Sequence, residues 1–319
     1  MINSLLSPDA IEQTDVLAGK LTESIEAFQH DLQTGLVEVS IPGMTGQILL
    51  FSRGELVSVY RGDDTVERID PAIWLESLNG SNPGASLRRL ALTPQDVRVF
   101  KILIEQKSDD RCNLAAGLAL EKQFTEWMEL PAPALAQVRW PKAEALVMFP
   151  GQGVPPYYTL FISANQILHS AGGMSEIYGW KESYESLRLF SSEPRTLAWS
   201  EFLLYHAFSS LVSSLLVRVE KLIGRLMLNQ IIRDVNFKAT AHDWNLSINA
   251  SSVNDQSIFT SPAAAAEVYS RLLEVIFHSL ESLLGGAMLE MLVREAVYRL
   301  SPAARQVLKE YLPITNLGS

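Results

Sequence analysis

Two long segments in the C-terminal third have apolar residues at the three- and four-residue steps of an amphipathic α-helix. The first runs from Trp199 to about Phe237, and the second runs from Pro262 to Leu300. Either segment would be about 60 Å long as an unbroken helix, because each residue adds about 1.5 Å. Two such helices cannot enclose a core alone, so they must break and fold back, pair with a second chain, or pack on the rest of the protein.

Among these alternatives we favour pairing with a second copy, because helical hairpins from two subunits bury both apolar faces around a twofold axis. Gly285-Gly286, inside the second segment, indicates a bend or a close helix contact, since each Gly costs about 1 kcal/mol relative to Ala in a helix. The candidate contact residues are the apolar stripe and one tryptophan of the connecting loop: Leu204, Phe208, Leu211, Leu215, Leu222, Leu272, Ile276, Leu283 and Trp244.

The N-terminal third alternates helical and strand-like patterns. A helix is predicted over Asp9–Gln33, followed by strand-like runs that Pro42-Gly43 and Arg53-Gly54 divide into a meander of three short strands. The elements expected next are a short helix from Asp70, a strand over 84–92, and a helix with Thr93 as N-cap and Pro94 at its first position. This order predicts an α+β unit.

The same region resembles the PATAN domain, a module of bacterial signalling proteins. The resemblance covers roughly residues 15–107 and depends on turn glycines and apolar strand positions: Thr34, Gly35, Gly46, Phe51, Gly54, Leu56 and Val57. It implies an α+β regulatory or interaction module. The family supplies no catalytic residues to transfer to this chain.

A second meander follows at an offset of 108 to 111 residues, where the run from Leu146 repeats the Leu-Val, Pro-Gly, Leu-Phe and Ser of the run from Leu36. This order predicts a tandem duplication, and the alternative is two unrelated hairpins with common turn chemistry. Under this alignment FPGQG, residues 149–153, is the second copy of the IPGMTG turn. A helix ending near Glu129 and the proline-rich stretch 130–141 are expected to join the units.

The letters FPGQG also occur beside the active site of acyltransferases, but that chemistry requires a nucleophilic serine in a G-x-S-x-G turn, and no serine here has it. The five histidines are not spaced as metal ligands: His30, His169, His206, His242 and His278. There is no phosphate loop and no G-x-G-x-x-G sequence. The sequence therefore predicts no catalytic residues, no cofactor and no metal.

Charge and hydropathy restrict the partners. A net charge of −10 without a long basic run opposes binding to nucleic acid or to an anionic membrane surface. The most apolar stretch, 202–217, is too short and too polar to span a bilayer, which needs about 20 apolar residues. The single cysteine, Cys112, and the lack of a signal-peptide pattern favour a cytoplasmic protein.

Together these patterns predict an α+β protein with two tandem β-meander and helix units followed by a long-helix bundle. The expected domains are 1–110, the PATAN-like unit; 111–195, a linker helix and a second, diverged unit; and 196–319, the bundle with polar loop 238–261. We expect a homodimeric, non-enzymatic adaptor or regulator of bacterial signalling or complex assembly, acting through hairpin faces and the bundle. The alternatives are a small-molecule sensor, with a pocket between the repeats or at 240–257, and an enzyme of unrecognised type.

Overall fold

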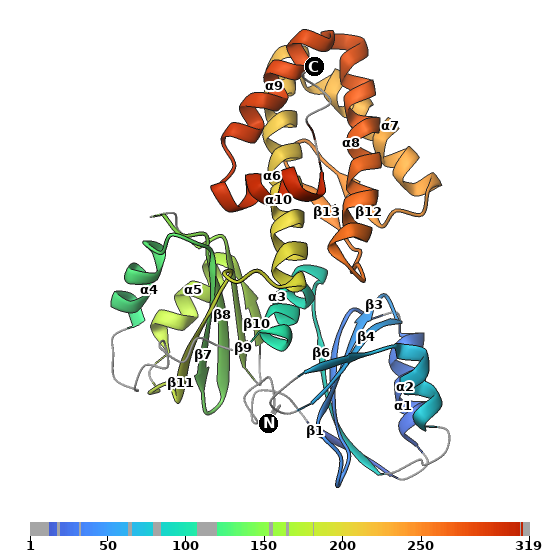
Figure 1. Cartoon of the computed structure of the whole chain (residues 1–319), viewed down its shortest axis with the longest axis vertical. Helices are drawn as coiled ribbons and strands as arrows, with labels where there is room; N and C mark the ends of the chain where they lie inside the picture. Colours follow the sequence, from blue (N-terminus) through green and yellow to red (C-terminus); the bar gives the residue numbers. More distant parts are fainter. Residues whose placement is uncertain are drawn as a thin grey trace. The chain divides into compact units, whose positions relative to one another are not determined.

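The structure, a computed structural model, describes residues 13–17, 20–31, 33–62, 66–78, 84–106, 120–152, 156–163, 166–180, 182–312 and 314. The chain divides into two compact units, Met1–Thr196 and Leu197–Ser319. The first unit contains two antiparallel sheets with their helices, and the second is mainly helical (Figure 1). The predicted α+β class, with two meander units before a helical C-terminal region, is confirmed.

The first sheet is antiparallel throughout, with the strand order β1-β6-β2-β3-β4-β5. Its strands are β1 (Gln13–Val16), β2 (Gly35–Ser40), β3 (Gln47–Ser52), β4 (Glu55–Arg61), β5 (Glu67–Ile69) and β6 (Ala85–Ala91). Two helices, α1 (Leu21–His30) and α2 (Pro71–Leu78), pack on one face. Phe28 of α1 and Trp74 of α2 are buried against apolar strand residues there.

The second sheet has the strand order β10-β9-β8-β7-β11 and is also antiparallel. Its elements are α4 (Leu120–Met128), β7 (Ala134–Trp140), β8 (Ala143–Phe149), β9 (Tyr158–Ser163), β10 (Gln166–His169), α5 (Ser170–Gly179) and β11 (Ser186–Ser191). Helices α4 and α5 pack on one face, where Phe124, Trp127 and Ile177 join the strand side chains in one apolar core.

The two sheets have the same connectivity, because β6-β2-β3-β4-β5 corresponds in order to β11-β7-β8-β9-β10. Their registers also agree. Gly35 lies opposite Phe51 and Ala91, just as Ala134 lies opposite Phe149 and Ser191. Equivalent residues are thus 98 to 100 positions apart. The predicted alignment, at 108 to 111 residues, was wrong by one strand, since it placed β2 on β8.

The corrected register changes the assignment of FPGQG. Gly151 and Gln152 have left-handed φ values of 81° and 59°, and the equivalent residues Arg53 and Gly54 have 50° and 82°. The stretch therefore corresponds to the turn after β3 and not to IPGMTG, as the sequence had predicted. A Cβ atom on Gly151 would lie 2.4 Å from the carbonyl oxygen of Leu130, so glycine is required where the turn approaches the backbone.

Two further predictions differ from the structure. The helix predicted over 9–33 is limited to α1, and Gln13–Val16 forms edge strand β1, which pairs with β6; residues 1–12 lie outside the described part. The proline-rich joint contains β7, a central strand. Its prolines precede and follow the strand, so their missing N–H groups remove no hydrogen bond from the ladder.

Helix α3 (Pro94–Glu105) is hydrogen-bonded to both sheets. The hydroxyl of Tyr60 on β4 donates to the Glu105 carboxylate at 2.9 Å, and the hydroxyl of Tyr158 on β9 donates to Asp96 at 2.6 Å. Asp96 is fully buried and also completes a capping box with Thr93, the predicted N-cap. Burial and the neighbouring Asp96 raise the pKa of Tyr158 well above 10, so its hydroxyl remains a proton donor.

The second unit is built around α6 (Leu197–Ile223), which packs on each of the other helices. These are α7 (Arg225–Ala241), α8 (Pro262–Leu284), α9 (Gly286–Tyr298) and α10 (Pro302–Tyr311); a short hairpin of β12 (Leu246–Ile248) and β13 (Val253–Asp255) connects α7 to α8. Both long predicted helices are interrupted, at Gly224 (φ 78°, ψ 159°) and at Gly285 (φ 76°, ψ 154°). The chain therefore folds back twice within one unit.

Candidate functional site

Most of the apolar stripe predicted as a contact surface lies in the core of the helical unit. Six of its side chains are no more than 1% exposed: Leu204, Phe208, Leu211, Leu215, Leu272 and Ile276. The ring of Phe208 stacks on Tyr269 of α8 with centroids 4.2 Å apart. These side chains pack against other helices of the same unit, because the breaks at the two glycines allow the apolar faces to close on one another.

The other two leucines of the predicted stripe have a different environment. Leu222 and Leu283 each lie two residues before a glycine break, and both are about half exposed, at 52% and 46%. Further exposed apolar side chains follow the breaks, and together they define the corner patch: Leu222, Leu226, Met227, Leu283, Met288 and Met291. Their exposed fractions range from 39% to 89%. Figure 1 shows both breaks at the same end of the helical unit.

The corner patch is flanked by opposite charges on its two halves. Arg225 is the first residue of α7, and Glu281 lies in the last turn of α8; both are exposed. Each charge is at the helix end that the macrodipole disfavours, since helix N-termini favour anions and C-termini favour cations. Neither placement stabilises its own helix. An oppositely charged group next to Arg225 or Glu281 would offset the unfavourable interaction of that residue with its helix dipole.

Trp244 and the polar loop form an ordered connection. The indole of Trp244 is half-buried and stacks on His242 with ring centroids 4.9 Å apart. The Asn236 side chain donates to the carbonyl of Ile248 and accepts from its N–H, at 2.9 and 2.8 Å. The buried Asp255 carboxylate accepts from Tyr269 at 2.6 Å and from the Ser257 N–H at 2.8 Å. These polar groups of the 240–257 segment thus hold the hairpin to α7 and α8.

His206 and His169 lie in different environments. His206 lies on α6, where burial lowers its pKa from 6.5 to about 4, so it is neutral near pH 7. His169 Nδ1 is 3.5 Å from Asp96, but that carboxylate already accepts hydrogen bonds from Thr93 and Tyr158. No group of three His, Cys, Asp or Glu residues in the described chain could hold a metal ion. Cys112 lies outside the described residues.

Helix α6 is long and apolar enough to cross a membrane when judged by length and composition only. Of its apolar window, 56% is buried inside the protein, and a buried core helix meets the same length and composition criteria. Within the described chain it is the one helix that meets these criteria. By itself, one such helix is weak evidence for a membrane span, and it extends beyond the stretch 202–217 considered in the sequence.

Four members of the corner patch were not among the candidate contact residues, namely Leu226, Met227, Met288 and Met291, although the sequence pattern places Leu226 and Met291 on the apolar stripes. The sequence feature that precedes Leu226 and Met227 is Gly224, but the direction in which this glycine turns the helix depends on its backbone conformation. Comparisons with known proteins add no relative, since no family model, no curated protein and no solved structure matches the chain.

Proposed function

We propose that this protein is a non-enzymatic adaptor or regulatory protein that acts by binding other proteins, and that the corner patch joins two copies of the chain. The observation that supports this most strongly is the set of six exposed apolar side chains at one end of the helical unit. Monomeric soluble proteins rarely expose large contiguous apolar patches, and such patches mark interaction sites. Three of the six are methionines, whose flexible side chains adapt to a partner surface.

The charges at the patch favour a second copy as the occupant. In a twofold interface the same surface of both subunits meets, so the α6–α7 corner of one chain can lie against the α8–α9 corner of the other. Arg225 would then approach Glu281 of the second copy. The attraction between these opposite charges would offset the unfavourable interaction of each with its own helix dipole. The patch is thus complementary to itself in both polarity and charge.

The resemblance of residues 15–107 to the PATAN domain supports a regulatory role in bacterial signalling. The same topology is present twice in the first unit, so a dimer would display four α+β modules. Linked modules bind a multivalent partner more tightly than one module alone, because the later contacts become intramolecular. Dimerisation would in this way strengthen weak contacts made by each hairpin face.

Light scattering coupled to size-exclusion chromatography tests the proposal. The wild type should have twice the chain mass of 35.4 kDa at micromolar concentration. Leu226→Glu, which places a charge at the most exposed position of the patch, should have the mass of one chain. Phe237→Glu is the matched control, since Phe237 is also highly exposed on α7 but outside the patch, and it should remain dimeric. A monomeric wild type, or a Leu226→Glu protein that stays dimeric, would contradict the proposal.

A further inference from the structure

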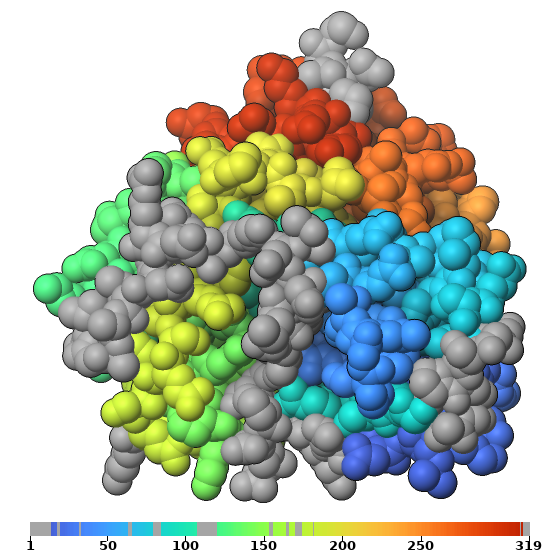
Figure 2. Space-filling view, turned by 60° about the horizontal axis from the view of Figure 1, so that its bottom comes forward, coloured from blue at the N-terminus to red at the C-terminus, as the bar shows by residue number. Residues whose placement is uncertain are grey.

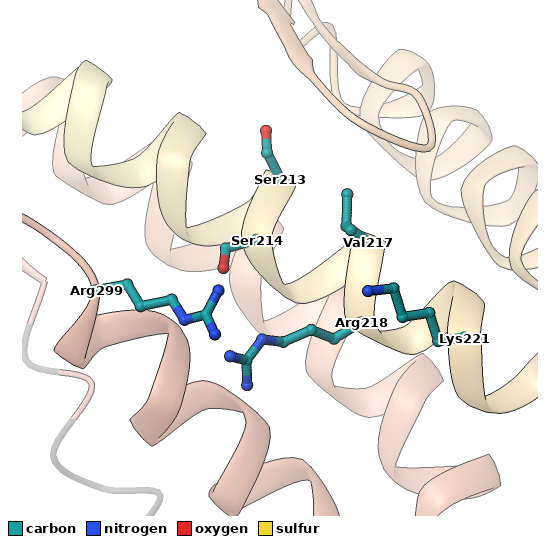
Figure 3. Close-up of a pocket in the computed structure, with 6 residues that line it drawn as sticks. All are labelled: Ser213, Ser214, Val217, Arg218, Lys221 and Arg299. Carbon is teal, nitrogen blue, oxygen red and sulfur yellow. The ribbon is translucent and has the colours of Figure 1, made fainter. Parts of the chain in front are cut away.

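A cavity of about 410 Å³ opens on the helical unit between α6 and the end of α9 (Figure 3). It is lined by five residues of α6 and by the residue that follows α9: Ser213, Ser214, Val217, Arg218, Lys221 and Arg299. Its volume is within the range of small-molecule sites, about 300 to 1,000 Å³. Half of the lining residues are cations, although the whole chain has a net charge of −10.

The positive charge of this cavity is only partly neutralised. Arg218 forms an ion pair with Glu295. In the described structure this is the one carboxylate that pairs with any of the three cations. Three cations and one carboxylate leave two positive charges at the site. The Arg218 side chain is 17% exposed, so water hydrates its charge poorly.

Two of the three cationic side chains point toward the same place. Figure 3 shows the guanidinium groups of Arg218 and Arg299 directed toward each other from two different helices, with the Ser214 hydroxyl directed to the same side. Like charges that face each other repel, and an anion between them would remove the repulsion. Two of the cations have a structural explanation, since Arg299 caps the C-terminus of α9 and Lys221 lies in the last turn of α6, where a cation is favourable. That explanation does not apply to Arg218, which lies further inside α6.

We propose that this cavity binds the phosphate dianion of a small organic phosphate. Two guanidinium groups can each donate paired hydrogen bonds to phosphate oxygens, Lys221 adds a point charge, and Ser214 adds a hydroxyl donor. The net charge of the site matches that of a phosphate monoester near pH 7. The remaining volume, next to Val217, has room for an apolar part of the ligand. This role goes beyond the proposed dimerisation and does not depend on it.

Isothermal titration calorimetry at low salt tests this site with two probes, inorganic phosphate and adenosine monophosphate. The wild type should bind both, and tighter binding of adenosine monophosphate would identify an organic phosphate as the ligand class. Arg299→Gln should weaken binding at least tenfold, because a charge-assisted hydrogen bond contributes about 1.5 to 3 kcal/mol. Lys221→Gln should weaken it less. Both residues are exposed, so neither change disturbs the core.

The matched control is Arg233→Gln, which removes an exposed cation of α7 outside the cavity and should leave binding unchanged. The monomeric Leu226→Glu protein should bind as the wild type does, which separates this inference from the dimer. Three results would overturn the proposal: no heat with either probe, unchanged binding in Arg299→Gln, or equal weakening in Arg233→Gln. Weaker binding of adenosine monophosphate than of inorganic phosphate would overturn the assignment of an organic phosphate as the ligand.

Discussion

The two glycine breaks determine whether the long helices fold back, so replacing them perturbs the structure directly. Gly224 and Gly285 have φ near 77° and ψ near 157°, a region that is almost exclusive to glycine. An added Cβ would meet no atom within 4 Å at either position, so steric overlap contributes nothing. Gly224→Ala and Gly285→Ala should therefore each lower the free energy of unfolding by about 1 to 3 kcal/mol through backbone strain alone.

Alanine also favours a continuous helix by about 1 kcal/mol over glycine. Each substitution therefore also stabilises an unbroken helix, which competes with the folded-back form. Urea unfolding followed by circular dichroism should show midpoints lower by roughly 0.5 to 1.5 M, for a slope near 2 kcal/mol/M. The matched control is Gly179→Ala, at an open position of α5 without a left-handed φ, which should change stability by less than about 0.5 kcal/mol. An unchanged or higher stability of Gly224→Ala would refute the strained corner.

Three further predictions concern the cores of the two units. Tyr158→Phe removes a hydrogen bond to the buried Asp96 and should cost about 1 to 3 kcal/mol in thermal unfolding, whereas Tyr298→Phe, at an exposed position, should be neutral. Gly151→Ala should cost at least about 1 kcal/mol in the same assay, because its Cβ would collide with a backbone carbonyl. The pKa of His206 is lowered to about 4, so the unfolded state binds a proton first as pH falls. The free energy of unfolding should have its full value above pH 6.5 and decrease by up to about 3 kcal/mol toward pH 4. In urea unfolding at pH 7.5 and 5, His206→Gln should reduce this dependence on pH.

Local chemistry was sufficient to predict several elements of the fold. Thr93 and Pro94 marked the start of α3, and Pro42-Gly43 and Arg53-Gly54 marked the turns of the first meander. The register of the repeat was not predictable in this way, because Leu-Val, Pro-Gly and Leu-Phe pairs suit many strands and turns. The strand β7 was hidden by prolines at its ends, and only its pairing with β8 and β11 identifies it as central.

The candidate surface shows a different limit. Periodicity predicts which residues share a helix face, but it does not identify what covers that face. Leu215 and Leu222 belong to the same predicted stripe, yet the first is buried and the second is about half exposed. The difference arises near Gly224, where the chain turns and the stripe ends. The cationic cavity was not predictable from the sequence for a similar reason. Arg299 is far in sequence from Arg218, and only the fold brings the two residues to the same cavity.

A charge-reversal cycle tests the twofold corner interface most directly. Sedimentation equilibrium should show that Arg225→Glu and Glu281→Arg each weaken the dimer, because each places like charges opposite one another across the twofold axis. The double variant restores the opposite pairing and should recover most of the wild-type association. A double variant that is no tighter than the two single variants, or single variants that dimerise as the wild type does, would contradict the interface.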